Sequence, residues 1–287
     1  MKNFEYVKVK TLEEAIVFLA ENGEKAHILA GGTDVLVKLK QKQIAPDMLI
    51  DIKGVSGLDG IELYPEGGMR IGSLTTVREI EISPVVRERL PVLADAAHWL
   101  GSVQVRHRAT IGGNLCNALP SADMGPYLIG MGAWVVVVGH EGERRLLVEE
   151  LFADSGRNSL RTGEVVTAIE IPPWTRYTGG AYIKHAIKNA VDVSIVSVAV
   201  VVVTDIGKKV FEDGKIVLGA VGPTPIRALR AEEYLRGKRI EEEVIVKVGE
   251  LASRDARPRT AAEYKTEVVG VLTRRAMREA LQRIFEG

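Results

Sequence analysis

Two glycine turns, far apart in the chain, place the strongest constraint on what this sequence can form. The first, Ala30-Gly31-Gly32-Thr33-Asp34, follows the apolar pair Ile28-Leu29 and precedes a segment with helical character. Glycine accepts positive φ and lets main-chain amides come close to an anion, so consecutive N–H groups can form a phosphate-binding nest. Thr33 adds a hydroxyl donor, whereas the Asp34 carboxylate would repel phosphate, and we expect it to point away and to cap the next helix or hold the turn. The turn predicts an anion site, with a purely structural turn as the alternative.

The second turn, Ala109-Thr110-Ile111-Gly112-Gly113-Asn114, is richer in polar groups. Asn117, Ser121 and Asp123 follow it in a stretch that is poor in charge. Hydroxyl, amide and carboxylate groups on a flexible backbone suit a ribityl chain and a pyrophosphate. An ordinary polar surface loop uses the same residue types for its own turns and is the alternative. Two such turns in one chain favour the ligand-binding interpretation.

Composition and motif spacing exclude several other kinds of site. Lys plus Arg and Asp plus Glu each number 38, so the net charge gives no reason to expect a nucleic-acid partner. The single cysteine, Cys116, cannot supply a cysteine-ligated iron–sulfur cluster or an internal disulfide. The 5 histidines lack the spacing of metal ligands, and neither glycine turn has Rossmann or P-loop spacing. We therefore expect no catalytic acid–base group, no metal site and no Rossmann-type NAD site.

Hydrophobic periodicity predicts an α+β fold in two domains. The first domain, residues 1–173, has two lobes, about 1–55 and 56–173, and Pro172-Pro173 marks its end. Residues 177–287 form a second domain with a small antiparallel sheet and helices. The first helix starts at a Thr11–Glu14 capping box. The expected elements are strands over 4–9, 26–30, 48–52, 61–63, 69–71, 133–138, 165–171, 179–184, 194–203 and 215–220, and helices over 12–22, 35–39, 85–100, from 231 onwards and over 266–285.

No segment has the pattern of a membrane anchor or an export signal. The longest apolar tract, residues 193–203, is far shorter than the ~20 residues that cross a bilayer, and we interpret it as a buried strand. The first residues, Met1-Lys2-Asn3-Phe4-Glu5-Tyr6, include an acid and lack the apolar stretch of a secretory signal. With one cysteine in the chain, these features predict a cytoplasmic protein without a transmembrane segment.

Taken together, the two turns and their neighbours resemble the FAD subunits of the xanthine dehydrogenase and carbon monoxide dehydrogenase (molybdenum hydroxylase) family over the whole chain. The resemblance implies the two-lobed FAD-binding fold shared with vanillyl-alcohol oxidase, followed by a smaller C-terminal domain with an antiparallel sheet. Some relatives carry an additional iron–sulfur insertion, and with a single cysteine we expect it to be absent or nonfunctional in this chain. The matching segments are residues 28–34, 50–52, 104–106 leading into 110–118, and 164–172.

The resemblance also implies which residues bind FAD. The first turn wraps the pyrophosphate, and the second contacts the rest of the cofactor. In some members a position near Leu100 faces the flavin through an aromatic ring, so leucine here removes a stacking partner at that site. Lys184 corresponds to a lysine near the flavin ring, where a cation favours the reduced, anionic flavin, although by itself it is an ordinary solvated strand lysine. The candidate cofactor-binding residues are Ile28, Leu29, Ala30, Gly31, Gly32, Thr33, Asp34, Val35, Leu100, Ala109, Thr110, Gly113, Asn114, Asp123, Val166 and Lys184.

By the same resemblance, this chain transfers electrons inside a larger complex. The expected partners are a molybdopterin-binding large subunit and a small subunit with [2Fe-2S] clusters, assembled as a dimer of heterotrimers. Electrons from the clusters reach FAD and leave to an external acceptor such as NAD or a quinone. Two alternatives remain open: a self-sufficient FAD reductase similar to UDP-N-acetylenolpyruvoylglucosamine reductase, and a scaffold that has lost FAD. The substrate is not determined by this chain.

Overall fold

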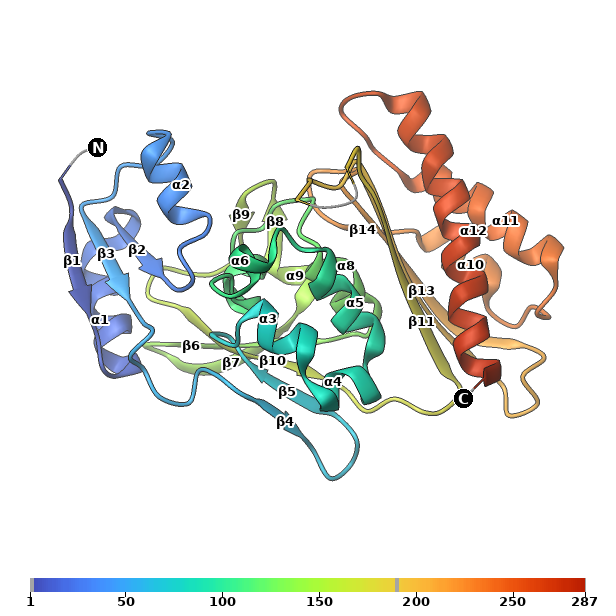
Figure 1. Cartoon of the computed structure of the whole chain (residues 1–287), viewed down its shortest axis with the longest axis horizontal. Helices are drawn as coiled ribbons and strands as arrows, with labels where there is room; N and C mark the ends of the chain where they lie inside the picture. Colours follow the sequence, from blue (N-terminus) through green and yellow to red (C-terminus); the bar gives the residue numbers. More distant parts are fainter. Residues whose placement is uncertain (1–2, 189–190, 287) are drawn as a thin grey trace.

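The first lobe is a small parallel sheet with helices packed around it. The computed structural model describes residues 3–188 and 191–286, and Figure 1 shows this lobe at one end of the elongated molecule. The sheet order is β1-β3-β2. The predicted capping box is confirmed, because Thr11 Oγ1 accepts a hydrogen bond from the Glu14 amide at 3.2 Å and the Glu14 carboxylate accepts one from the Thr11 amide. The elements are β1 (Glu5–Lys8), α1 (Leu12–Asn22), β2 (Ala26–Leu29), α2 (Val35–Lys40) and β3 (Met48–Asp51).

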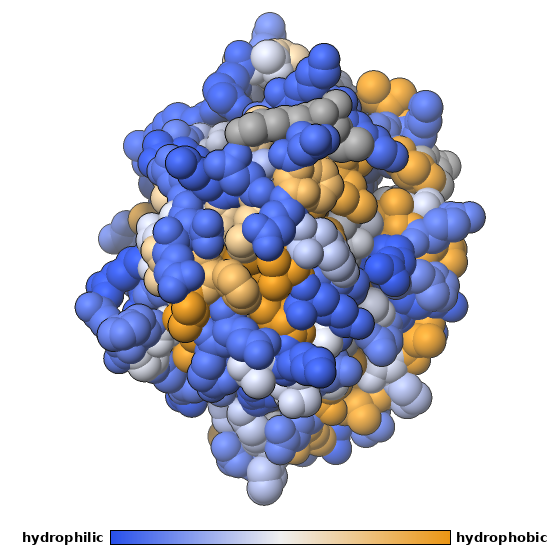
Figure 2. All heavy atoms as spheres, turned by 90° about the vertical axis from the view of Figure 1, so that its left-hand side faces the viewer, coloured by the Kyte–Doolittle hydropathy of each residue, from blue (hydrophilic) through white to orange (hydrophobic). Residues whose placement is uncertain are grey.

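The outer face of this lobe is mainly polar. Figure 2, which views the molecule from this end, shows hydrophilic side chains over most of the face with apolar atoms between them. Among the described residues of the lobe, the exposed large apolar side chains are Tyr6, Val17, Leu36 and Val37. The buried side of the lobe is a core of α1 and sheet residues that also includes Leu58 and Val165 of the second lobe. The two lobes therefore share part of one apolar core.

The second lobe is an antiparallel sheet with its helices gathered on one face (Figure 1). The strand order is β4-β5-β10-β6-β7, and the predicted hairpin is β4 paired with β5. The strands are β4 (Ile61–Leu63), β5 (Met69–Gly72), β6 (Trp134–Gly139), β7 (Gly142–Leu147) and β10 (Val165–Ile171), with a separate hairpin of β8 (Phe152–Asp154) and β9 (Arg157–Asn158). The helices are α3 (Val77–Ile82), α4 (Pro84–Arg89), α5 (Pro91–Trp99), α6 (Val103–Arg106), α7 (Ile111–Cys116), α8 (Met124–Gly130) and α9 (Val148–Leu151).

The prediction of a single helix over residues 85–100 was wrong. Two helices, α4 and α5, meet at Leu90, whose φ of −135° and ψ of 57° are not helical. Pro91 explains the break, because proline has no amide hydrogen for the i→i−4 bond and clashes with the preceding turn. It is instead well suited to the first position of a new helix. Helix α3, which starts at a second capping box formed by Thr76 and Glu79, was not predicted.

The C-terminal domain is an antiparallel sheet covered on both faces. Its order is β11-β12-β13-β14, and one face packs on the C-terminal helices. The other face contributes Tyr182, Ala199, Val201 and Val217 to the core of the second lobe. In the described part of the chain, no helix is long and apolar enough to cross a membrane. The elements are β11 (Thr178–His185), β12 (Val196–Thr204), β13 (Phe211–Gly219), β14 (Ile226–Arg227), α10 (Leu229–Leu235), α11 (Glu242–Asp255) and α12 (Ala262–Glu286).

Candidate functional site

A cavity of about 830 Å³ lies between the first and second lobes, within the size range of cofactor pockets. Both glycine turns line it. All the candidate residues from the sequence line it except Leu29, Asp123 and Lys184. The structure therefore brings together two turns that are almost eighty residues apart, as a shared ligand would require. The candidates that line the cavity are Ile28, Ala30, Gly31, Gly32, Thr33, Asp34, Val35, Leu100, Ala109, Thr110, Gly113, Asn114 and Val166.

The two turns touch each other through Gly31. A Cβ atom at Gly31 would lie 1.9 Å from the Arg108 carbonyl oxygen and 3.0 Å from the Ala109 Cα atom. The first turn can therefore approach the backbone of the second only because residue 31 has no side chain. Gly32 has a φ of +79°, a conformation that L side chains rarely adopt. Both glycines are required by the backbone, one for close approach and one for its dihedral angle.

The second turn is anchored to the end of β5. Thr110 caps α7, and its Oγ1 accepts a hydrogen bond from the Gly113 amide at 3.1 Å. The Gly112 amide donates to the Ser73 carbonyl oxygen at 2.9 Å, and a Cβ at Gly112 would lie 2.7 Å from the Ser73 Cβ. The turn therefore has one defined position, with its polar groups at the cavity wall.

Unsatisfied polar groups are concentrated at this cavity. Among the described residues, four buried side-chain atoms have no hydrogen-bond partner, and three of them belong to cavity-lining residues: His27 Nδ1, Ser73 Oγ and Asn114 Oδ1. The fourth is Thr204 Oγ1. The amides of Gly31, Gly32 and Thr33 also donate to no acceptor in the described chain. Leaving a buried polar atom unpaired costs about 1–3 kcal/mol, so the cavity fits a ligand that carries many hydrogen-bonding groups. His27 and Ser73 were not predicted as site residues, because nothing in the neighbouring sequence marks them as cavity residues.

Asp34 does not cap α2. It occupies the N-cap position, but its side chain makes no capping hydrogen bond, so this part of the prediction was wrong. Its φ of −102° and ψ of −50° are already helical, whereas a capping side chain needs an extended backbone to reach the amides of the first turn. The carboxylate is exposed at the cavity wall.

Asp123 and Lys184 pair with each other rather than line the cavity. Lys184 Nζ donates to an Asp123 carboxylate oxygen at 3.1 Å and to the Trp99 carbonyl oxygen at 3.0 Å. The Lys184 side chain is 3% exposed, so the alternative of a solvated strand lysine was wrong. Tyr182 and Ser194 also donate to Asp123. Burial raises the pKa of Asp123, although Lys184 and these hydroxyls oppose the shift. The cluster holds Trp99 and Asp123 in place. Their chain neighbours, Leu100 and Ala122, line the cavity.

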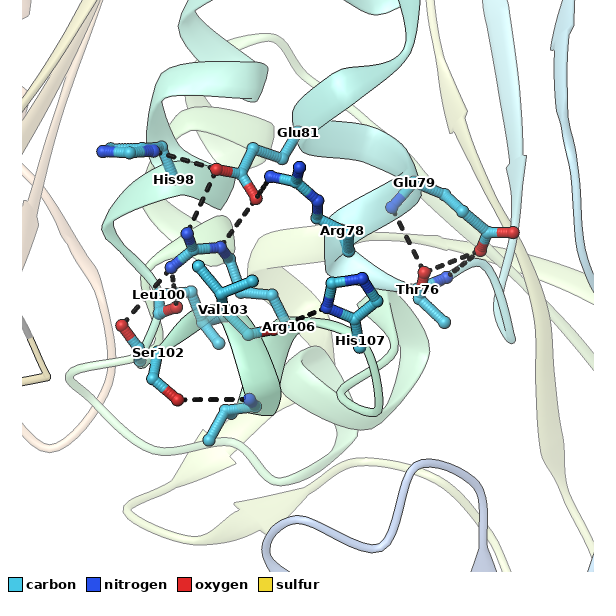
Figure 3. A network of polar contacts seen from close by, with 12 residues as sticks. Thr76, Arg78, Glu79, Glu81, His98, Leu100, Ser102, Val103, Arg106 and His107 are labelled. Carbon is cyan, nitrogen blue, oxygen red and sulfur yellow. Dashed lines mark hydrogen bonds and ion pairs between the residues drawn. The ribbon is translucent and has the colours of Figure 1, made fainter.

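A second buried ion pair holds the segment that enters the second turn (Figure 3). Arg106 Nε and Nη2 donate to the two Glu81 carboxylate oxygens at 2.7 and 3.1 Å, while Nη1 donates to the carbonyl oxygens of Leu100 and Gly101. The two ionic side chains are 5% and 4% exposed. Burial alone would raise the pKa of Glu81, but hydrogen bonds from Arg106, His98 and Arg78 outweigh it and lower that pKa to about 2. Arg106 was part of a segment that matches the family, residues 104–106, but no structural role was predicted for it.

Cys116 behaves as a packing residue. It lies at the cavity and is a free thiol. Burial raises its pKa to about 12, so the reactive thiolate is scarce at neutral pH. Among the residues that the structure describes, no group of His, Cys, Asp and Glu could hold a metal ion.

Comparison with known families decides which ligand this architecture serves. A family model described as the FAD binding domain in molybdopterin dehydrogenase matches residues 2–174. The chain belongs to this family. A second model, the CO dehydrogenase flavoprotein C-terminal domain, matches residues 181–280. The resemblance inferred from the glycine turns is thereby confirmed, and FAD is the cofactor of this chain.

Relatives and solved structures match over nearly the full length. A xanthine dehydrogenase FAD-binding subunit of Escherichia coli O157:H7 is 30% identical over 96% of this chain and 95% of its own. The glyceraldehyde dehydrogenase medium chain of Sulfolobus acidocaldarius is 30% identical over 96% of this chain and 98% of its own. A structure of carbon monoxide dehydrogenase from Hydrogenophaga pseudoflava, which lacks the Mo-pyranopterin moiety of the molybdenum cofactor, matches with a TM-score of 0.93 and 33% identity, covering 98% of both chains. The predicted fold class is confirmed, and the chain is an oxidoreductase subunit.

Proposed function

We propose that this chain is the electron outlet of a three-subunit molybdenum hydroxylase. In this proposal a small subunit with [2Fe-2S] clusters delivers electrons to the FAD of this chain, and an external acceptor such as NAD or a quinone removes them. A molybdopterin-binding large subunit carries out the hydroxylation, and the complex is a dimer of heterotrimers in the cytoplasm. The full-length relatives named as FAD-binding subunit and medium chain of dehydrogenases support this assignment.

The observation that carries the proposal is the cavity between the lobes with its unsatisfied donors and acceptors. Free amides at Gly31, Gly32 and Thr33 suit the diphosphate of FAD. The rest of FAD carries hydroxyl groups and ring nitrogens, which suit the unpaired side-chain atoms of His27, Ser73 and Asn114. Bound FAD supplies the redox chemistry of its isoalloxazine ring, and the protein supplies position and electrostatics. Nothing in the proposal requires this chain to bind the hydroxylated substrate.

The remaining candidate residues support the cofactor in two ways. Leu100 and Val166 give the cavity apolar wall area, as a flavin ring would require. We assign Asp123 and Lys184 a positioning role, because their ion pair fixes the backbone at Trp99 and thereby the neighbouring Leu100. The negative charge of Asp123 also offsets the positive charge that Lys184 would otherwise project towards a flavin.

The reductase alternative is disfavoured by the C-terminal domain. A self-sufficient reductase needs substrate-binding and proton-donating residues in its third domain. Here residues 181–280 instead match the C-terminal domain of the CO dehydrogenase flavoprotein, and the helices α10, α11 and α12 cover one face of its sheet. This domain suits the role of a structural and docking element in a larger enzyme.

The unsatisfied atoms give a direct test of where FAD binds. We expect the purified chain to bind one FAD and show flavin absorption bands, and Ser73→Ala and Asn114→Ala each to weaken binding about tenfold, because each loses a hydrogen bond worth about 1.4 kcal/mol. Titration by flavin fluorescence measures the affinities. Thr204→Val is the matched control, since Thr204 carries an equally buried and unpaired hydroxyl away from the cavity. No flavin bands, or an equal loss in the control, would contradict the site.

The partners are tested in the native source. We expect a tagged copy of this chain to co-purify with two further polypeptides, and the isolated complex to contain molybdenum and iron by elemental analysis. A matched sample, prepared from the tagged chain expressed alone in a heterologous host, should contain FAD but neither metal. If the native chain purifies alone and without either metal, the three-subunit proposal is wrong and the reductase alternative is favoured.

A further inference from the structure

Lys38 links the two sides of the cavity. It lies on α2 in the first lobe, and its Nζ donates to the Asn117 side-chain oxygen at 2.6 Å. Asn117 is the C-cap of α7 in the second lobe. Both residues line the cavity. Neither glycine turn includes Lys38, so the sequence motifs give it no role.

Among the residues that the structure describes, no carboxylate forms an ion pair with Lys38. The cavity is lined by three basic side chains, Lys38, Arg157 and Arg161. Arg161 is paired with Glu141 at 2.8 Å, and Arg157 is exposed on the β8–β9 hairpin. Within the described ranges, the only side chain that bonds to the Lys38 ammonium group is the neutral amide of Asn117. A partly buried ammonium group with a neutral partner is a favourable site for an added anion.

The charge reaches the interior of the cavity. His27 lines the same cavity, and its pKa is lowered mainly by burial and in part by the positive charge of Lys38, against the effect of a backbone hydrogen bond. Lys38 therefore places a positive charge close enough to act on His27 inside the cavity. The free amides of Gly31, Gly32 and Thr33 belong to the turn that immediately precedes α2, the helix that carries Lys38.

We propose that Lys38 is an FAD-binding residue, whose ammonium group pairs with the FAD diphosphate while its hydrogen bond to Asn117 holds the two lobes together around the cofactor. The inference rests on FAD occupying this cavity. The diphosphate carries two negative charges, and the backbone amides supply dipoles but no full positive charge. Lys38 supplies that charge from the first lobe.

The test compares FAD affinity and its salt dependence in four variants. We expect Lys38→Gln to bind FAD about tenfold more weakly and to lose part of the salt dependence, because a screened ion pair is gone. Lys38→Arg should retain affinity within about threefold. Asn117→Ala, which keeps the charge, should lose less affinity and keep the salt dependence. Lys40→Gln is the matched control, because Lys40 lies on the same helix but is exposed and does not line the cavity.

Three results separate the outcomes. Lys38→Gln with wild-type affinity and wild-type salt dependence would overturn the proposal. Equal losses in Lys38→Gln and Asn117→Ala, with the salt dependence unchanged in both, would show a purely structural hydrogen bond and would also overturn it. Absence of FAD binding by the wild-type chain would instead refute the assignment of the cavity. Thermal melts of the variants without FAD verify that each one is folded.

Discussion

Replacing Gly31 with alanine is expected to weaken FAD binding at least 100-fold, about 2.8 kcal/mol. The added Cβ would lie 1.9 Å from the Arg108 carbonyl oxygen. The Arg108 oxygen is a backbone atom, so it cannot yield as the end of a flexible side chain would. The two turns must separate, and the groups that each presents to the cofactor no longer fit one ligand. Flavin fluorescence titration of the purified variant measures the loss.

A matched glycine variant tests whether the effect is local. Gly207→Ala introduces the same methyl group in the C-terminal domain, where its nearest neighbour is a side-chain atom, an Asp205 carboxylate oxygen at 2.8 Å, and where it does not line the cavity. This variant should bind FAD like the wild type. A Gly31→Ala protein that is folded by circular dichroism and binds FAD normally would show that the two turns do not depend on this contact.

Removing the Arg106 guanidinium is expected to destabilise the fold by about 3 kcal/mol, the lower end of the usual effect of removing one partner of a buried ion pair, because Arg78 and His98 still contact Glu81. In Arg106→Met, the buried Glu81 carboxylate loses its two-point partner, and the carbonyl oxygens of Leu100 and Gly101 lose their donor. FAD affinity should fall as well, because Leu100 lines the cavity. The urea midpoint of unfolding and an FAD titration measure the two effects.

Two further variants make this result interpretable. Arg145→Met removes a surface ion pair with Glu170, in which the arginine side chain is 56% exposed, and should change stability by less than about 1 kcal/mol. The double variant Glu81→Leu with Arg106→Met removes both charges and should recover part of the stability. A single Arg106→Met variant as stable as the wild type would show that the pair is not a structural element.

The same pair predicts how acid affects stability. The pKa of Glu81 in the folded chain is about 2, below the value of about 4.3 for an unperturbed glutamate. Because the folded pKa is the lower one, the stabilisation is complete above the unfolded value and is lost as the pH falls towards 2. Urea midpoints measured from pH 6 down to pH 3 should therefore decline less steeply in Glu81→Gln than in the wild type.

Local sequence signals predicted the elements that depend on local chemistry. The capping box at Thr11, the helix end at Gly23 and the first glycine turn are set by backbone requirements within a few residues. The residues that complete the site are set by contacts between distant segments. Ser73 joins the site through β5, and Lys184 is buried because Asp123, 61 residues away, accepts its hydrogen bond. Pro91 is a signal for a helix break, but the helical pattern of apolar residues continues on both sides of it. The break was therefore not predicted.

The shared core of the second lobe and the C-terminal domain makes them one mechanical unit. Tyr182, Val201 and Val217 of the C-terminal sheet are buried in the same core as Leu128 of α8, and the Lys184–Asp123 pair adds a polar tie across the junction. Interiors packed in this way transmit displacement rather than absorb it. A subunit that docks on the C-terminal domain would therefore meet a rigid spacer, at a constant distance from the wall of the cavity at Leu100.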